Sequence, residues 1–267
     1  MMRKWLIPVT LPLAGVALFL YSLHVIDRFL RVQMRDHPRY LLPFDQIEPS
    51  APPGLSRQEF LAEVQKLGRL SERVNLLDDD TIPRLREAFA KHAWVEEVRQ
   101  VEILGSEGIQ VDLVFRLPVL AIPQVGPTRC VDGNGILLPD SCPIDGIVTW
   151  RGHATTPLGP AGTLWGDKDI EASAAILKVL HHHQEKLQIK AVAVRSGEVT
   201  FTTKGGSLIL WGHPSGKEGK EEAAEKEKVA FLAKYCQDYG SLERPSGPQE
   251  IDLRPKKKPL LRPLGPG

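Results

Sequence analysis

The segment Asn75-Leu-Leu-Asp-Asp-Asp-Thr-Ile-Pro-Arg-Leu-Arg-Glu-Ala-Phe-Ala-Lys-His-Ala-Trp-Val-Glu-Glu-Val-Arg99 decides the fold of the region from Glu72 to Leu120. It predicts a helix, because its three aspartates can accept hydrogen bonds from the free N–H groups of a helix N-terminus and complement the helix dipole. Pro83 falls in the first turn, where its missing donor costs nothing. Apolar side chains then recur at helical spacing, at Ile82, Leu85 and Phe89. We expect the helix to stop near His92 and Trp94 to open a strand.

A second strand is predicted from Ile109 to Phe115. Apolar residues alternate along it with Gln110 and Asp112, which is the period of a strand with one buried face. A helix followed by two strands, without a nucleophile or a ligand set, is expected to pack and to bind.

The composition is that of an ordinary folded protein of about two domains. The chain has 267 residues, of which 42% are hydrophobic and 25% charged, enough to bury a core. A formal net charge of +1 gives no general case for binding nucleic acid. Three cysteines without C-x-x-C spacing exclude a disulfide scaffold and a zinc site of that type.

An uncharged run from Trp5 to Ile26 follows Arg3 and Lys4. Roughly 20 apolar residues cross a bilayer, so the run predicts a transmembrane helix. A cleavable signal peptide is the alternative, but the run exceeds the usual apolar region of about 7–15 residues and offers no small-x-small cleavage site. Arginines on both sides leave the orientation unsettled by charge.

The first folded unit is expected to run strand, helix, helix, strand, strand. An extended segment around Tyr40 to Ile47 precedes Ser56-Arg-Gln-Glu59, which has the pattern of a capping box before an apolar helix. That order would close a three-stranded sheet with two helices on one face.

The second unit is expected to be a mixed β domain with two helices. Asp132-Gly-Asn-Gly135 is a strong hairpin turn between apolar strands. The other expected elements are strands at 146–150, 189–194 and 250–254, a hairpin at 198–211, and helices from Asp169 and over about 221–237. Residues 255–267 are rich in proline and lysine, and we expect them to be disordered.

This order of elements resembles the FtsQ/DivIB family of bacterial cell division proteins. The similar stretches are Asn75-Leu-Leu-Asp with His92-Ala-Trp-Val-Glu-Glu-Val, Cys130-Val-Asp-Gly-Asn-Gly-Ile-Leu-Leu-Pro139, and Glu227-Lys-Val-Ala-Phe-Leu with Ile251-Asp-Leu-Arg254. The resemblance implies a membrane anchor with a cytoplasmic N-terminus, a POTRA domain and a β domain outside the cytoplasm. It also implies a non-enzymatic scaffold that binds other single-span division proteins by β-strand addition at a sheet edge.

Two positions depart from the family pattern. Phe115-Arg-Leu-Pro118 lacks the acid of the family's Glu-Arg-x-Pro. Pro255 follows the last strand at once, where the family continues the strand and uses its edge for a partner; proline cannot donate to such a ladder.

Several residues suggest chemistry that their setting does not favour. His181 to His183 are consecutive, so on a helix they point about 100° apart and cannot converge on a metal. Gly212-His-Pro-Ser-Gly-Lys217 is too short for a phosphate-binding loop. Asp78 to Asp80 are explained by helix capping, without catalysis.

Three further groups leave alternatives open. The turn after Asp132 would put Cys130 opposite about Leu137, so a disulfide with Cys142 needs the chain to fold back. Lys256 to Lys258 are expected to be solvated, with lipid or partner contact as the alternative. Core packing is the first expectation for the tryptophans of the β domain, with interface anchoring as the alternative: Trp150, Trp165 and Trp211.

The expected fold class is α+β, and the expected domains are consecutive: residues 1–27 as stub and transmembrane helix, 28–39 as linker, 40–122 as POTRA-like domain, 123–254 as β domain and 255–267 as tail.

The expected partner-binding residues are Glu250, Ile251, Asp252, Leu253 and Arg254. The expected partners are other single-span division proteins, with residues 5–26 in the inner membrane. No cofactor, metal, catalytic residue, nucleic acid or small-molecule substrate is expected. The alternative functions are an anchored POTRA adaptor in envelope protein transport and, less favoured, an anchored hydrolase.

Overall fold

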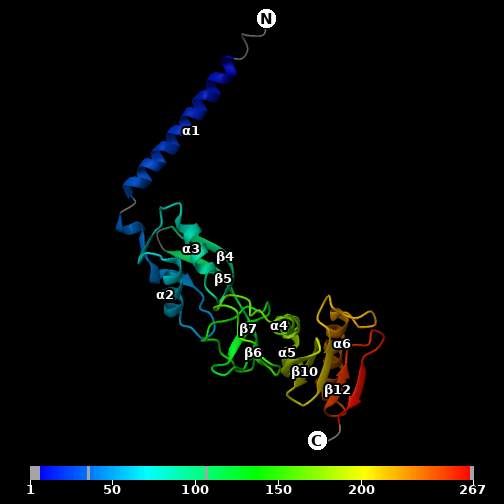
Figure 1. Ribbon diagram of the computed structural model, residues 1–267. Coiled ribbons are helices and arrows are strands. Elements are labelled where there is room, and N and C mark those ends of the chain that lie inside the picture. Colours follow the sequence, from blue (N-terminus) through cyan, green and yellow to red (C-terminus); the bar gives the residue numbers. More distant parts are fainter. Residues whose placement is uncertain (1–6, 35–36, 106–107, 265–267) are drawn as a thin grey trace. The chain divides into compact units, whose positions relative to one another are not determined.

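The computed structural model describes residues 7–34, 37–105 and 108–264, which form an α+β protein (Figure 1). The chain divides into two compact units that interleave along the sequence. The first holds residues up to Ser50, Arg57–Ala90 and Val98–Leu113, and the second holds Ala51–Ser56, Lys91–Glu97 and Val114 onward. The α+β class is the one expected from the sequence.

The N-terminal helix α1 runs from Ile7 to Met34. Across the described ranges, no helix combines the length and the apolar character needed to cross a membrane. The predicted transmembrane helix is therefore wrong. The prediction counted uncharged residues, and Tyr21, Ser22 and His24 are uncharged without being strongly apolar; the helix also continues into Asp27. The expected cytoplasmic stub and the first residue of the run, Trp5, lie outside the described residues.

The first unit contains two small sheets and two helices. Its elements are a short 3-10 turn at Pro38–Tyr40 (η1), β1 (Leu41–Pro43), a second 3-10 turn at Phe44–Gln46 (η2), β2 (Glu48–Pro49), α2 (Arg57–Gly68), β3 (Arg73–Asn75), α3 (Thr81–Ala90), β4 (Val95–Ile103) and β5 (Ile109–Phe115). The three-stranded sheet has the order β2-β5-β4, with β2 parallel to β5. The extended segment before α2 is split, because β1 pairs separately with β3.

The deciding segment folds largely as predicted. Helix α3 directly follows the three aspartates, and the bounds and alternating burial of β5 are those expected. Leu85 and Phe89 are buried, and the Phe89 ring lies 5.9 Å from the ring of Phe60 on α2, centroid to centroid. Ile82 is 36% exposed and does not join this face.

The second unit is built on an eight-stranded mixed sheet of order β13-β12-β11-β10-β9-β8-β6-β7. Its strands are β6 (Pro118–Ile122), β7 (Arg129–Asp132), β8 (Val148–Trp150), β9 (Ile189–Arg195), β10 (Glu198–Thr203), β11 (Leu208–Gly212), β12 (Gln249–Asp252) and β13 (Leu260–Pro263). Its helices are α4 (Lys168–Leu180), a 3-10 turn η3 (His181–His183), α5 (Gln184–Leu187) and α6 (Glu225–Tyr239). The hairpins β7 to Leu138 and β10 to β11 form at the two predicted turns.

One large apolar core joins this sheet to its helices. Leu120, Val192, Phe201 and Ile251 from the sheet pack in the same buried cluster as residues of α4 and α6, among them Leu177 and Leu232. The three tryptophans of the domain, Trp150, Trp165 and Trp211, are buried in this cluster as well, which confirms core packing.

Two features differ from the expected domain limits. Strand β6 was placed in the first domain, but it pairs with β7 and β8 and belongs to the large sheet. The tail expected to be disordered forms β13, because Leu260 to Pro263 find a hydrogen-bonding edge on β12 that the local sequence does not reveal. The last three residues of the predicted tail are not described.

Candidate functional site

The predicted partner-binding strand lies inside the sheet, not at its edge. Strand β12 pairs in parallel with β11 on one side and antiparallel with β13 on the other, with Glu250 opposite Arg262 and Asp252 opposite Leu260. Ile251 and Leu253 are completely buried, Asp252 nearly so, and Glu250 is partly exposed. Of the residues expected to form an open edge, Glu250 to Asp252 are therefore covered by the chain's own C-terminal strand, and Leu253 and Arg254 lie beyond this ladder.

The outermost strand, β13, offers little to an added strand. The Leu264 N–H donates to the Pro248 carbonyl at 2.9 Å, so the backbone N–H and C=O groups of Leu264 face β12. Backbone groups of residues two apart point to the same side. Those of Arg262 and Leu260 therefore face β12, whereas those of Leu261 and Pro263 face outward. Because Pro263 has no N–H, Leu261 supplies the one outward donor within β13.

Beyond β12 the chain turns away from the sheet and is held by the segment before α6. The Ala223 N–H donates to the Arg254 carbonyl at 2.8 Å, and the Lys256 N–H donates to the Glu221 carbonyl at 3.0 Å. Pro255 lies between these two bonds, at a position where no donor is needed. It therefore fits the segment between the end of β12 at Asp252 and the start of β13 at Leu260 without the loss of a hydrogen bond.

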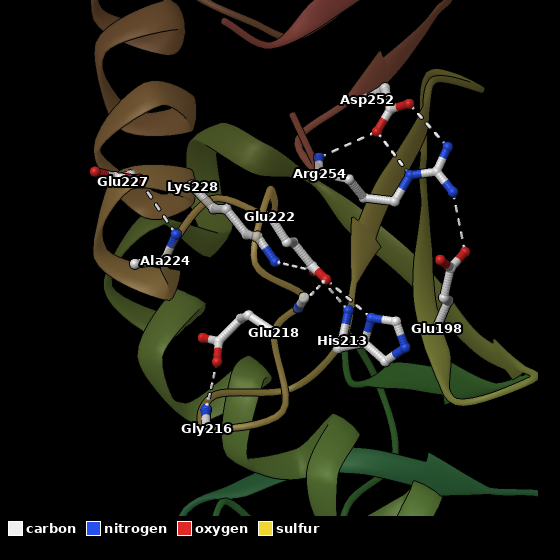
Figure 2. Close-up of polar contacts among 11 residues, drawn as sticks. Glu198, His213, Gly216, Glu218, Glu222, Ala224, Glu227, Lys228, Asp252 and Arg254 are labelled. Atoms are coloured by element: carbon white, nitrogen blue, oxygen red, sulfur yellow. Dashed lines mark hydrogen bonds and ion pairs between the residues drawn. The ribbon is translucent and has the colours of Figure 1, made fainter. Parts of the chain in front are cut away.

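Arg254 fastens this turn to the sheet (Figure 2). Its guanidinium makes two bonds to the Asp252 carboxylate, from Nε at 2.9 Å and Nη2 at 2.8 Å, and its Nη1 donates to Glu198 Oε2 at 3.0 Å. Such a two-pronged contact fixes geometry as well as charge. The bond from Arg254 is the main reason why the pKa of Asp252 is lowered, and the same bond raises the pKa of Arg254.

A second network, centred on Glu222, holds the loop between β11 and α6 (Figure 2). Glu222 Oε1 accepts hydrogen bonds from Lys228 Nζ and from the His213 N–H, both at 2.7 Å. Its Oε2 lies 2.9 Å from His213 Nδ1 and accepts from the Gly219 N–H at 3.2 Å. Burial raises the pKa of Glu222, but these bonds together outweigh burial and lower it to about 2.

Lys228 reaches Glu222 from the first turns of α6. None of its side chain is exposed, and its ammonium lies 5.2 Å from the centre of the Trp211 ring, within cation–π range. The lysine stem thus packs in the core while its charge is met by one carboxylate and one aromatic face. Sequence patterning treats such a lysine as solvated, and nothing in the local sequence reveals its partner.

A hollow of about 770 Å³ lies beside the end of β12. Charged side chains of both signs line it, including Glu198, Lys220, Asp252, Arg254 and Lys257. This wall suits a polypeptide that carries charges better than an apolar small molecule.

The other residues singled out from the sequence have the following positions. His181 to His183 form η3 at the end of α4, and in the described part of the chain no three His, Cys, Asp or Glu side chains are arranged to hold a metal ion. Asp78 to Asp80 precede α3, and Gly212–Lys217 is a loop in which His213 is held by Glu222. Lys256 to Lys258 are exposed, which agrees with the expected solvation.

Comparison with models of known protein families and with curated proteins finds no match for this chain. The resemblance to FtsQ/DivIB proteins therefore rests on the motifs and the order of elements.

Proposed function

We propose that this chain is a non-enzymatic scaffold of the FtsQ/DivIB type, which binds an extended segment of another division protein along β12. The observation that carries the proposal is the place of β12 beside a short, exposed C-terminal strand. The partner segment would take the place of β13, with its backbone paired to Glu250 and Asp252. This mode is strand addition in which the chain's own tail is the first occupant.

Several features make β13 replaceable. Each of its four residues is exposed, with Leu260 and Leu261 44% and 43% exposed, and none of them belongs to the buried core of the sheet. An ion pair across the ladder joins Arg262 Nη1 to Glu250 Oε1 at 3.4 Å; the arginine side chain is 67% exposed and the glutamate 23%, and pairs at the surface contribute about 0–1 kcal/mol. The remaining attachment is a few backbone hydrogen bonds, each worth about 0.5–1.5 kcal/mol net.

The outward face of β13 disfavours addition of a further strand. Within β13, Leu261 supplies the one outward N–H donor, because Pro263 has none. A proline on an edge strand disfavours pairing with a further strand. Binding by exchange at β12 avoids this problem, because the groups of Glu250 and Asp252 that now pair with β13 become the template.

A partner must compete with β13, which is linked to β12 within the same chain. Hydrogen bonds hold the chain as far as Lys256, so only residues 257–259 connect this fixed part to β13. A short tether of this kind corresponds to an effective concentration in the mM range, against which a partner competes. A segment carrying a basic residue opposite Glu250 would reproduce the Arg262 contact, and an extended segment with that charge is the partner we propose.

Amide hydrogen exchange tests the replaceable strand within the intact chain. The amides of Glu250 and Asp252 face β13, whereas those of Ile251 and Leu253 face β11, where the Leu253 N–H donates to the Leu210 carbonyl at 3.0 Å. We expect the first pair to exchange at least 10-fold faster than the second, because local release of β13 exposes only the first pair. Equal protection of all four would contradict strand exchange.

The division role is tested in dividing cells by localisation and pull-down. We expect the chain at the septum, with a division protein recovered whose binding depends on Glu250. Uniform distribution without a septal partner would contradict the division role even if the exchange result holds.

A further inference from the structure

The segment after the first hairpin of the large sheet folds back on its starting strand. Leu138 lies opposite Cys130 on β7, and its N–H donates to the Cys130 carbonyl at 2.9 Å. A turn follows immediately, in which the Cys142 N–H donates to the Pro139 carbonyl at 3.0 Å. This turn is the chain reversal that a bond between Cys130 and Cys142 requires, and it places Cys142 four residues after Leu138, the residue opposite Cys130.

Both cysteines are buried in one small apolar cluster. Cys130 is 1% exposed and Cys142 is 8% exposed, and they share this cluster with Trp94, Ala121 and Leu138. Neither is bonded to another cysteine in this structure. The two thiols therefore lie in the same cluster, and backbone hydrogen bonds join the segments that carry them. This arrangement favours a disulfide between them.

Within this cluster each thiol affects the pKa of the other. The hydrogen bond from the Cys142 thiol is the main reason why the pKa of Cys130 is lowered, although burial opposes it, and Arg129 adds to the lowering. The same interaction, together with burial, raises the pKa of Cys142. The Cys142 S–H donates to the Pro143 carbonyl at 3.6 Å. Cys130 is thus the thiol that ionises first, and the thiolate is the attacking species in disulfide exchange.

We propose that Cys130 and Cys142 form a disulfide that fastens the 136–142 segment to the β7 edge of the sheet. The oxidant is a low-molecular-weight disulfide. When the turn at 139–142 opens locally and admits the oxidant, the Cys130 thiolate attacks one of its sulfurs and expels the other as a thiolate, which takes up a proton. Cys142 then loses its proton and attacks the Cys130 sulfur, releasing the second small thiol. Two protein thiols are oxidised, and one small disulfide is reduced to two thiols.

The bond would reinforce the cover of one sheet edge. Strand β7 is the end of the large sheet opposite β13, and its outer side is covered by Ile136 to Leu138 through bonds such as that from the Asp132 N–H to the Ile136 carbonyl at 3.0 Å. The ion pair between Arg129 and Asp140 also spans the cover. A disulfide between residues 130 and 142 would close a loop over the same contacts and keep this edge from opening.

Cys236 provides an internal control. It lies on α6, is 3% exposed, and its Sγ is 3.9 Å from the Lys186 carbonyl oxygen. Burial is the main reason why its pKa is raised, and it belongs to the large core cluster rather than to the cluster that holds Cys130 and Cys142, so it has no cysteine beside it to pair with.

The test is to incubate the reduced, folded chain with oxidised glutathione, quench with acid, unfold, alkylate with iodoacetamide and map the peptides. We expect a cross-link between the peptides holding Cys130 and Cys142, with Cys236 alkylated. Cys236→Ser should keep the cross-link, and Cys130→Ser and Cys142→Ser should each abolish it.

The oxidised wild-type chain should melt about 5 °C or more above the same sample after reduction. Alkylation of all three cysteines, a stable glutathione adduct without cross-link, a cross-link that includes Cys236, or no change in melting temperature would each overturn the proposal.

Discussion

Lys228 Nζ lies 2.7 Å from Glu222 Oε1, and no part of the lysine side chain is exposed to solvent. A buried ammonium is tolerated only when a carboxylate and further polar or aromatic groups meet it. Here Glu222 is that carboxylate, and it also binds the loop through His213 and Gly219. One residue therefore joins the start of α6, the end of β11 and the connecting loop, next to the turn that ends β12.

Glu222→Gln should destabilise the chain strongly. The change leaves the Lys228 charge buried without its counter-charge, which costs about 3–5 kcal/mol. Chemical denaturation of the variant measures this loss. Glu221→Gln, at the neighbouring exposed position, should change stability by about 0.5 kcal/mol or less.

A companion variant separates charge from shape in this pair. Adding Lys228→Met to Glu222→Gln removes the buried charge, so we expect the double variant to be more stable than Glu222→Gln alone. A double variant that is as unstable as the single one would show that the loop contacts of Glu222, not the charge of Lys228, dominate.

The stability that Glu222 contributes should disappear in acid. Its pKa falls from 4.5 to about 2 on folding, so its contribution is fully present above pH 4.5 and is lost as the pH falls towards 2. Each pKa unit corresponds to about 1.36 kcal/mol, which makes the contribution on the order of 3 kcal/mol. Unfolding free energies of the wild type and Glu222→Gln, measured from pH 6 to pH 2, should therefore converge. A constant difference over this range would contradict the assignment.

Arg254→Lys should loosen the end of β12 at small cost in stability. Lysine cannot reproduce the two-pronged contact with Asp252, but Arg254 is 38% exposed, so we expect a loss of about 0.5–1 kcal/mol. The pKa of Asp252, which the arginine holds below its ordinary value, should rise in this variant. Titration of the Asp252 carboxyl carbon by NMR measures the rise, and an unchanged pKa would show that other groups set it.

Two glycines test the packing of the first hairpin of the large sheet. Gly135 and Gly146 have nearly equal positive φ angles, 76° and 78°, so alanine is strained by about 1–2 kcal/mol at both. A Cβ at Gly135 would lie 2.7 Å from Glu171 Cγ and 3.3 Å from its Cα, whereas nothing lies within 4 Å of one at Gly146. Gly135→Ala should therefore cost about 1–3 kcal/mol more than Gly146→Ala. Equal losses of unfolding free energy for the two variants would mean that Glu171 and α4 shift to accommodate the added Cβ at no cost.

Proline substitution distinguishes the two faces of β13. Arg262→Pro removes a donor that faces β12, so it should release the strand and speed exchange of the Glu250 amide severalfold. Leu261→Pro removes the outward donor and should leave that amide almost as protected as before. The reverse order of effects would show that the assigned facing of β13 is wrong.

Local pattern was sufficient where one side of a strand or helix is buried by nearby residues. The alternation from Ile109 to Phe115 fixed β5, and Asp132-Gly-Asn-Gly135 fixed a hairpin. The same approach failed at the N-terminal helix, because absence of charge was taken as apolar character. It also failed at Ile82, which has helical spacing but lies at the exposed margin of its helix.

Residues far apart in sequence decided the rest. Leu260 to Pro263 form a strand because β12 offers its free side, and Lys228 is buried because Glu222 and Trp211 meet its charge. The turn that brings Cys142 back to Cys130 follows from hydrogen bonds of β7 with its cover. Sequence by itself determined the α+β class and most elements, since these depend on the period of nearby side chains. Tertiary structure alone decided which strand edge is covered and which polar groups meet, since a residue's free energy there depends on its partners.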